Sequence, residues 1–321
     1  MRIKKNQSMK FRTELPVKSY PVQIDYHSKI FGLGSCFVDN IKEKLDFYQF
    51  QNLINPFGVI FNPVSLQNIT ERIVNQAFFT DKDLFKHQGL WKSFELHSSF
   101  NRLDKNTYLN RVNQQIEQAH NYLKTADWFF ITLGTAWVYR HKKSQKIVSN
   151  CHKVPQTEFD KICLSPTEIT NTLHDLIDLI SKFNPNIHFL MSISPVRHLK
   201  DGFVENQLSK AHLITALHQL KVPVNYFPSY EIMLDDLRDY RFYKDDFVHP
   251  NHLAINYIWD YFKQVLINPS EINTLKKIEK IQLGLHHKSF NPDLPQERQR
   301  LQKLHKEIEI LQKHYPWMQF K

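Results

Sequence analysis

The sequence predicts an α/β fold, with three layers (α/β/α) around a central, mainly parallel sheet. Apolar runs of strand length recur along the chain, and most of them end at a glycine, serine or proline. Amphipathic stretches of helix length separate these runs. Strands that are buried on both faces are near-continuous in apolar residues, and the intervening helices cover the two faces of the sheet.

The first predicted strand, residues 29–33, stops at Gly34 and Ser35, and a helix follows because Val38, Ile41 and Leu45 recur at helical spacing. Further strands are predicted at 128–133, 187–193 and 222–227. Further helices are predicted at 65–74, with Ser65 as its cap, and at 107–125, 167–183, 206–220 and 251–266. Pro250 is able to open the last of these helices. Its inward-facing residues are predicted to be Leu253, Tyr257, Ile258, Phe262 and Val265. Residues 51–63 contain two Asn-Pro corners around Gly58, which predicts a shaped loop.

The chain divides into a main domain, residues 1–268, and a C-terminal helical extension, residues 269–321. Leu301, Leu304, Ile308 and Leu311 form one helical stripe in the extension. We expect this extension to pack on the main domain or to mediate self-association. Residues 1–27 are predicted to be an extended lead-in, because Pro16 and Pro21 resist helix formation.

The composition is that of an ordinary globular protein, with 41% hydrophobic residues among 321. No apolar run approaches the roughly 20 residues that a membrane span needs, and the amino terminus lacks a signal-like apolar segment. Three cysteines without CxxC spacing favour a reducing compartment and argue against a structural zinc site. We therefore expect a cytoplasmic protein that does not bind membranes.

The net charge of +10 and the pI near 9.3 are compatible with an anionic partner such as nucleic acid or an acidic polymer. The basic residues are mixed with acids, however, and no nucleic-acid-binding motif is present. We interpret the charge as a solvated surface and expect no nucleic-acid partner.

Ligands of parallel α/β sheets lie beyond the carboxyl ends of the strands. This rule places Ser35, Thr135, Arg197 and Tyr230 along one rim. Ser35 would occupy the first turn of a helix, where free N–H groups and the helix dipole stabilise an oxyanion. The alternative is that Ser35 is simply an N-cap. We expect the adjacent Cys36 to be a buried structural residue.

A serine nucleophile needs a histidine to accept its proton and an acid to orient that histidine. Asp246 and His249 offer such a pair, because an aspartate three residues ahead can fold back onto the imidazole ring. Pro250 disfavours a helix at His249, so the pair is expected on a loop. A DxxH match alone is common by chance.

Six ordered motifs together resemble the GSCFA-domain family, which is similar in fold to SGNH/GDSL hydrolases. The resemblance covers about residues 10–265, and Val38 stands where the name motif has alanine. The motifs are Gly34-Ser35-Cys36-Phe37-Val38, Asn55-Pro56-Phe57-Gly58, Leu133-Gly134-Thr135-Ala136-Trp137, Asn150-Cys151-His152-Lys153, Ser194-Pro195-Val196-Arg197-His198 and Asp246-Phe247-Val248-His249-Pro250.

The resemblance implies that Ser35 is the nucleophile, with Asp246 and His249 as its partners and the N–H groups of Ser35 and Gly58 as oxyanion donors. SGNH enzymes usually carry an asparagine where this chain has Ala136. A missing donor costs about a hundredfold to a thousandfold in rate. Thr135 or Asn62 would have to replace it, or the site is slow or non-hydrolytic.

Other rim residues are candidates for substrate binding, each with a structural alternative. Trp137 and Tyr139 would stack on a sugar ring or pack in the core, and Gly134 would lie beside the substrate. Arg197 and His198 would hold a carboxylate or phosphate, or form a structural salt bridge. His152 and Lys153 would sit on a substrate loop; a metal site there lacks a second ligand at suitable spacing.

The sequence therefore indicates a serine esterase or deacylase acting on a small acyl ester, such as that of a carbohydrate, without a metal or organic cofactor. Two alternatives remain open. One is a weak or inactive relative that binds a glycan, acyl or anionic ligand. The other is an acyltransferase that uses the same three residues.

Overall fold

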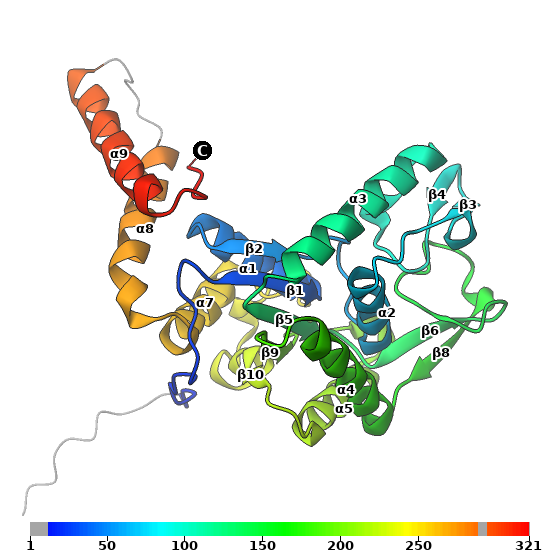
Figure 1. Cartoon of the computed structure of the whole chain (residues 1–321). Helices are drawn as coiled ribbons and strands as arrows, with labels where there is room; N and C mark the ends of the chain where they lie inside the picture. The colour runs from blue at the N-terminus through cyan, green and yellow to red at the C-terminus, as the bar shows by residue number, and fades with distance from the viewer. Residues whose placement is uncertain (1–11, 288–293, 321) are drawn as a thin grey trace, which may run out of the picture.

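A computed structural model describes residues 12–287 and 294–320 (Figure 1). Its centre is a five-stranded sheet in the order β10-β9-β5-β1-β2, and every pairing in it is parallel. The strands are β1 (Lys29–Gly34), β2 (Gln51–Ile54), β5 (Trp128–Leu133), β9 (His188–Ile193) and β10 (Asn225–Phe227). The α/β fold class predicted from the apolar runs is confirmed.

Helices cover both faces of the sheet because successive strand residues point to opposite sides. Phe31 and Leu33 of β1 belong to one core, whereas Ile30 belongs to the other. The first core is completed by α2 (Pro63–Val74), α3 (Lys105–Leu123), α4 (Pro166–Phe183) and α5 (Phe203–Gln219), and the second by α1 (Cys36–Phe47) and α7 (His252–Leu266). Figure 1 shows these helices on either side of the strands.

Two helix starts differ from the prediction. Asn62, not Ser65, caps α2: its side-chain oxygen accepts the Ser65 N–H at 2.8 Å, and Pro63 takes the first turn, where no N–H is needed. Asn251 caps α7, so Pro250 lies just before the helix rather than opening it. The prediction that Leu253 packs inward was wrong, because its position in the first turn of α7 leaves it exposed.

Short strands outside the main sheet were not predicted. They are the hairpin β3 (Phe85–His87) and β4 (Leu90–Lys92) and the antiparallel sheet of β6 (Trp137–His141), β7 (Ile147–Val148) and β8 (Phe159–Cys163). The edge strand β2 was also assigned to a loop. These segments are half-buried and short, so they lack the continuous apolar run that marks the central strands.

Single-turn segments complete the connections. They are η1 (Asp81–Asp83), η2 (Ser98–Phe100), η3 (Gln156–Glu158), η4 (Leu199–Asp201), α6 (Ser229–Glu231) with the π-helical turn η5 (Ile232–Asp236), η6 (Tyr240–Phe242) and η7 (Pro269–Glu271).

The C-terminal extension forms α8 (Ile272–His286) and α9 (Pro295–His314). The predicted stripe faces inward: Leu304 and Leu311 are buried, and Leu301 and Ile308 pack beside them. Figure 1 shows this pair on the side of α1 and α7. Tyr48 donates to Glu279 at 3.0 Å, which ties α8 to the end of α1. The domain boundary at residue 268 stays a prediction.

Across residues 12–287 and 294–320, no helix combines the length and the apolar character required to cross a membrane.

Candidate active site

Ser35 lies where β1 passes into α1, beside the point at which the order of the parallel strands reverses. It is the N-cap of α1, and its Oγ accepts the Phe37 N–H at 3.2 Å. Gly34 is required at this corner because a Cβ there would lie 2.5 Å from the carbonyl oxygen of Thr132. Ser35 is therefore held at the carboxyl end of the sheet, whatever its further role.

Asp246 and His249 form a hydrogen-bonded pair on the loop before α7. Asp246 Oδ2 lies 2.7 Å from His249 Nδ1, and its Oδ1 accepts the backbone N–H groups of His249 and Val248 at 3.0 and 2.8 Å. These bonds, first that from the His249 N–H, lower the pKa of Asp246 to about 2. An ionised aspartate on Nδ1 favours the tautomer in which Nε2 is free to accept a proton.

Ser35, Asp246 and His249 line one cavity of about 640 Å³. Asp246 and His249 are half-exposed in its wall, whereas Ser35 is 2% exposed. Within the described part of the chain, no hydrogen bond joins Ser35 Oγ to His249. The structure thus brings the three side chains to one cavity and pairs two of them.

The loop at residues 55–62 is fastened to the corner between β1 and α1 by Asn55. Its Oδ1 accepts the Gly34 N–H at 2.9 Å, and its Nδ2 donates to Asp39 at 2.7 Å. Gly58 has φ +75°, and a Cβ there would lie 2.5 Å from the Cβ of His97, which lines the cavity. This close approach explains why the Asn-Pro-Phe-Gly motif carries glycine.

The two backbone donors implied by the family resemblance already have acceptors. The Ser35 N–H donates to the Thr132 carbonyl at 3.0 Å, and the Gly58 N–H donates to the Asn55 carbonyl at 2.9 Å. Gly58 is also absent from the cavity lining. An oxyanion in the cavity would need these groups to exchange partners, or would use other donors.

Asn62 and Thr135 both line the cavity and carry side-chain donor hydrogens. Asn62 Nδ2 gives one hydrogen to Ser65 Oγ at 2.9 Å, and its second has no acceptor among the described residues. Thr135 Oγ1 accepts the Trp137 N–H and lies 2.9 Å from Ser209 Oγ. If Ser209 donates in that contact, the Thr135 hydroxyl hydrogen is left for the cavity.

A buried lysine, expected from the sequence only as a weak candidate at the start of a helix beside the rim, lies in the middle of α5 and supports the rim from below. Lys210 donates to the carbonyl oxygens of Gly134 and Ser194, both at 2.7 Å, and so ties together the ends of β5 and β9. Burial lowers its pKa to about 7. Its place on the buried stripe with Leu213 and Leu217 of α5 was the available signal.

His198 also lines the cavity, and its ring lies 5.4 Å from that of Phe61. Burial, and then the neighbouring Lys210, lowers the pKa of His198 to about 3. The imidazole is therefore neutral at physiological pH, and it does not act there as a cation toward an anionic substrate.

The expected substrate loop is divided between the cavity and the core. Asn150 and Cys151 line the cavity, whereas His152 and Lys153 do not. His152 is buried, with its Nε2 2.7 Å from the Ser93 carbonyl oxygen. Gly134 is likewise outside the lining, and its N–H donates to the Phe61 carbonyl at 2.8 Å.

Part of the cavity wall is aromatic. Trp137 and Tyr139 of β6 both line it. The Trp137 indole N–H donates to the Glu205 carbonyl at 3.1 Å, which fixes the ring, and the Lys161 ammonium lies 4.6 Å from the centre of that ring.

Cys36 also lines the cavity, so it is only partly buried rather than a core residue. Burial raises the pKa of its thiol and keeps the thiol protonated. Among residues 12–287 and 294–320, no three His, Cys, Asp or Glu side chains are grouped as metal ligands.

Comparisons with known proteins address the family directly. The model of the GSCFA family matches residues 29–262, and that of the GSCFA domain protein, C-terminal domain, matches residues 278–321. No curated protein matches the sequence significantly. A solved structure of a carbohydrate esterase family 3 from Talaromyces cellulolyticus is 10% identical and covers 78% of this chain and 98% of its own, with a TM-score of 0.36. Since the first model spans most of the chain, including Ser35 and His249, this protein belongs to the GSCFA family.

Proposed function

We propose that this protein is a serine-dependent hydrolase of small acyl esters, with Ser35 as nucleophile, His249 as general base and Asp246 as the residue that orients His249. The observation that carries the proposal is the shared cavity. Ser35, at the carboxyl end of β1, opens onto the space that holds the Asp246–His249 pair. A cavity that combines a serine, a histidine and an ionised aspartate supports acyl transfer chemistry.

In the proposed reaction, His249 Nε2 takes the Ser35 hydroxyl proton as Oγ attacks the ester carbonyl carbon. The carbonyl π bond breaks toward oxygen, and Asn62 and Thr135 donate hydrogen bonds to that oxyanion. Collapse of the intermediate breaks the ester C–O bond, and the alcohol leaves with the proton from His249. Water, deprotonated by His249, then attacks the carbonyl carbon of the acyl-serine. The bond from that carbon to Ser35 Oγ breaks, the acid leaves, and Oγ takes the proton back from His249, which restores both residues.

This mechanism requires Ser35 and His249 to come within hydrogen-bond distance when substrate binds. Catalytic hydrogen bonds are often long before substrate is present. His249 is half-exposed and lies on a loop, and Phe247 in that loop has φ +54°, outside the regions that a phenylalanine normally adopts. A loop of this kind is well suited to a small adjustment of the imidazole ring.

Labelling with a fluorophosphonate probe tests the nucleophile. We expect the native protein to be labelled and Ser35→Ala not to be. A Cys36→Ala control should label like the native protein, because the Cys36 thiol is protonated and is not the attacking group. Absence of labelling in the native protein, or equal labelling of Ser35→Ala, would refute the proposal.

A ligand-binding protein without turnover is the second candidate, and the engaged N–H groups of Ser35 and Gly58 favour it. It predicts no release of acid from short acyl esters together with a raised melting temperature in the presence of a glycan fragment. An acyltransferase would instead transfer the acyl group to an added alcohol in preference to water.

The aromatic side chains of Trp137 and Tyr139 in the cavity wall support a sugar ring as the alcohol part of the substrate.

A further inference from the structure

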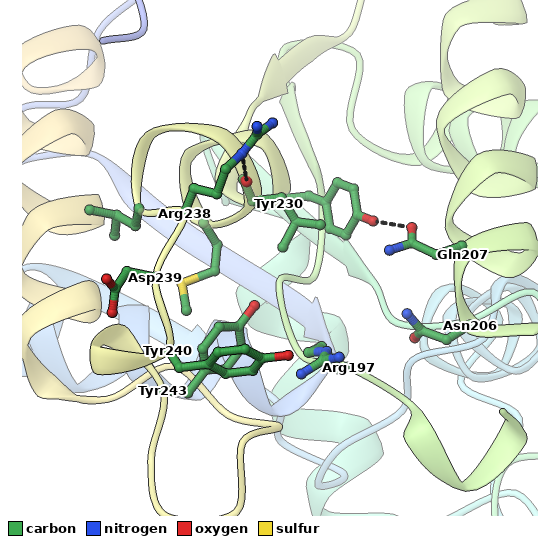
Figure 2. Close-up of a pocket in the computed structure, with 11 residues that line it drawn as sticks. Arg197, Asn206, Gln207, Tyr230, Arg238, Asp239, Tyr240 and Tyr243 are labelled. Carbon is green, nitrogen blue, oxygen red and sulfur yellow. Dashed lines mark hydrogen bonds between the residues drawn. The ribbon is translucent and has the colours of Figure 1, made fainter. Parts of the chain in front are cut away.

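A second, smaller cavity of about 250 Å³ adjoins the candidate active site (Figure 2). Arg197 lines both cavities, so the two spaces are neighbours with this residue in the wall of each. The remaining wall comes from the start of α5, from α6 with the turn that follows it, and from η6. Its polar side chains include Asn206, Gln207, Tyr230, Tyr240 and Tyr243.

The Arg197 guanidinium has no carboxylate partner within residues 12–287 and 294–320. It lies 5.5, 5.8 and 5.6 Å from the ring centres of Phe203, Tyr240 and Tyr243, and Nη1 donates to the Phe247 carbonyl at 3.0 Å. Figure 2 shows its guanidinium beside the two tyrosine rings at the edge of the cavity. One hydrogen bond leaves most of its five N–H groups available.

Asn206 and Gln207 present donors to the same space, because their acceptor atoms are already used. Asn206 Oδ1 accepts the His198 N–H at 2.8 Å, and Gln207 Oε1 accepts the Tyr230 hydroxyl at 2.8 Å. Neither amide nitrogen has an acceptor among the described residues. In Figure 2 the Gln207 nitrogen points into the cavity.

The charged groups at the far side of the cavity are neutralised locally. Asp239 accepts from the Arg241 backbone N–H and guanidinium at 2.8 and 3.1 Å. Arg238 pairs with Asp235 at 2.8 Å. The unpaired polar groups are therefore the N–H groups of Arg197, Asn206 and Gln207 and the hydroxyl groups of the two tyrosines, which can also donate. Donors around one positive charge favour an oxyanion over a cation or a neutral acceptor.

We propose that this second cavity binds an anionic oxygen group, a carboxylate or a phosphate, carried by the substrate of the adjacent serine site. The identity of the ligand as part of a substrate rests on the proposed function, whereas the binding of an anion by this cavity does not. Arg197 would supply the charge, and the amide groups of Asn206 and Gln207 would complete the hydrogen bonds. The substrate class is then an acyl ester of an anionic compound.

Calorimetric titration with sodium phosphate and, separately, sodium acetate at constant ionic strength tests the site. Asn206→Asp and Gln207→Glu are the informative variants, since each keeps the accepting oxygen and replaces the donor with a negative oxygen. We expect each to weaken the binding of phosphate or acetate at least about tenfold. Lys182→Gln on α4 changes the net charge by the same amount, and we expect it to have less than a twofold effect.

Tighter binding of one probe than the other identifies the group as phosphate or carboxylate. The proposal is overturned if the native protein binds neither anion, if both variants bind normally, or if Lys182→Gln weakens binding as much as they do. The titrations are repeated on Ser35→Ala, because anion binding does not require the protein to hydrolyse an ester. Anion binding without fluorophosphonate labelling would thus refute the hydrolase and leave the anion site standing.

Discussion

Replacing Lys210 with methionine gives a quantitative test of the support beneath the candidate site. The Lys210 residue is 1% exposed, and no carboxylate pairs with its ammonium group in the described part of the chain. Burial lowers its pKa from 10.5 to about 7. At 1.36 kcal/mol for each pKa unit, the charged lysine reduces the free energy of unfolding by about 5 kcal/mol below neutral pH.

The sign of the pH dependence follows from proton binding. Because the folded-state pKa is lowered, the unfolded chain binds more protons between about pH 7 and pH 10, and the free energy of unfolding rises with pH in that window. Lys210→Met has no such group. It leaves the carbonyl oxygens of Gly134 and Ser194 without their donor, at a pH-independent cost of about 1–3 kcal/mol each.

Between about pH 6 and pH 9, the native protein should therefore gain about 2–3 kcal/mol of unfolding free energy relative to Lys210→Met. Other titrating groups are present in both proteins and cancel in the difference. Urea denaturation at three pH values, followed by circular dichroism, measures it. The exposed variant Lys182→Gln should run parallel to the native protein. A difference that stays constant within about 0.5 kcal/mol would refute the burial of a charged lysine here.

Three further changes probe the candidate site. Gly58→Ala should destabilise the fold by about 1–3 kcal/mol in urea denaturation, through its positive φ and the clash with the Cβ of His97. His97→Gly removes that Cβ and should recover part of the loss in the double mutant. Asp246→Asn should lower kcat/KM for an acyl ester by about a hundredfold to ten-thousandfold. The melting temperature should be nearly unchanged, because the pair with His249 is half-exposed. Unchanged kinetics would remove Asp246 from the mechanism. Asn55→Ala leaves two polar groups unpaired and should cost about 2–4 kcal/mol, whereas no loss would show that the loop is held by other contacts.

Local patterns determined the main elements of the fold. The strand at 29–33 and the helix stripe of Val38, Ile41 and Leu45 follow from periodicity, because burial of a strand or a helix face is written in the spacing of apolar residues. The contact between Asp246 and His249 could also be predicted from the sequence, since only two residues of a tight loop separate them.

Partners that are distant in the chain were not accessible in this way. The half-buried strands β6 and β8 had no distinct apolar pattern, and they bring Trp137 to the cavity. The acceptor of the Ser35 N–H, Thr132, is chosen by the register of β1 against β5. Such choices depend on packing between elements and leave little trace in local spacing.

The sequence by itself determined that Ser35 follows a buried strand, that an acid and a histidine share one loop, and that the chain resembles the GSCFA family. Only the tertiary structure decided that these side chains open onto one cavity, that Lys210 ties two strand ends beneath it, and that Arg197 also lines a second cavity. The physical reason is that strand and helix propensities act over a few residues, whereas a cavity and its hydrogen-bond donors are defined by contacts between separate segments of the chain, such as those that carry Ser35 and His249.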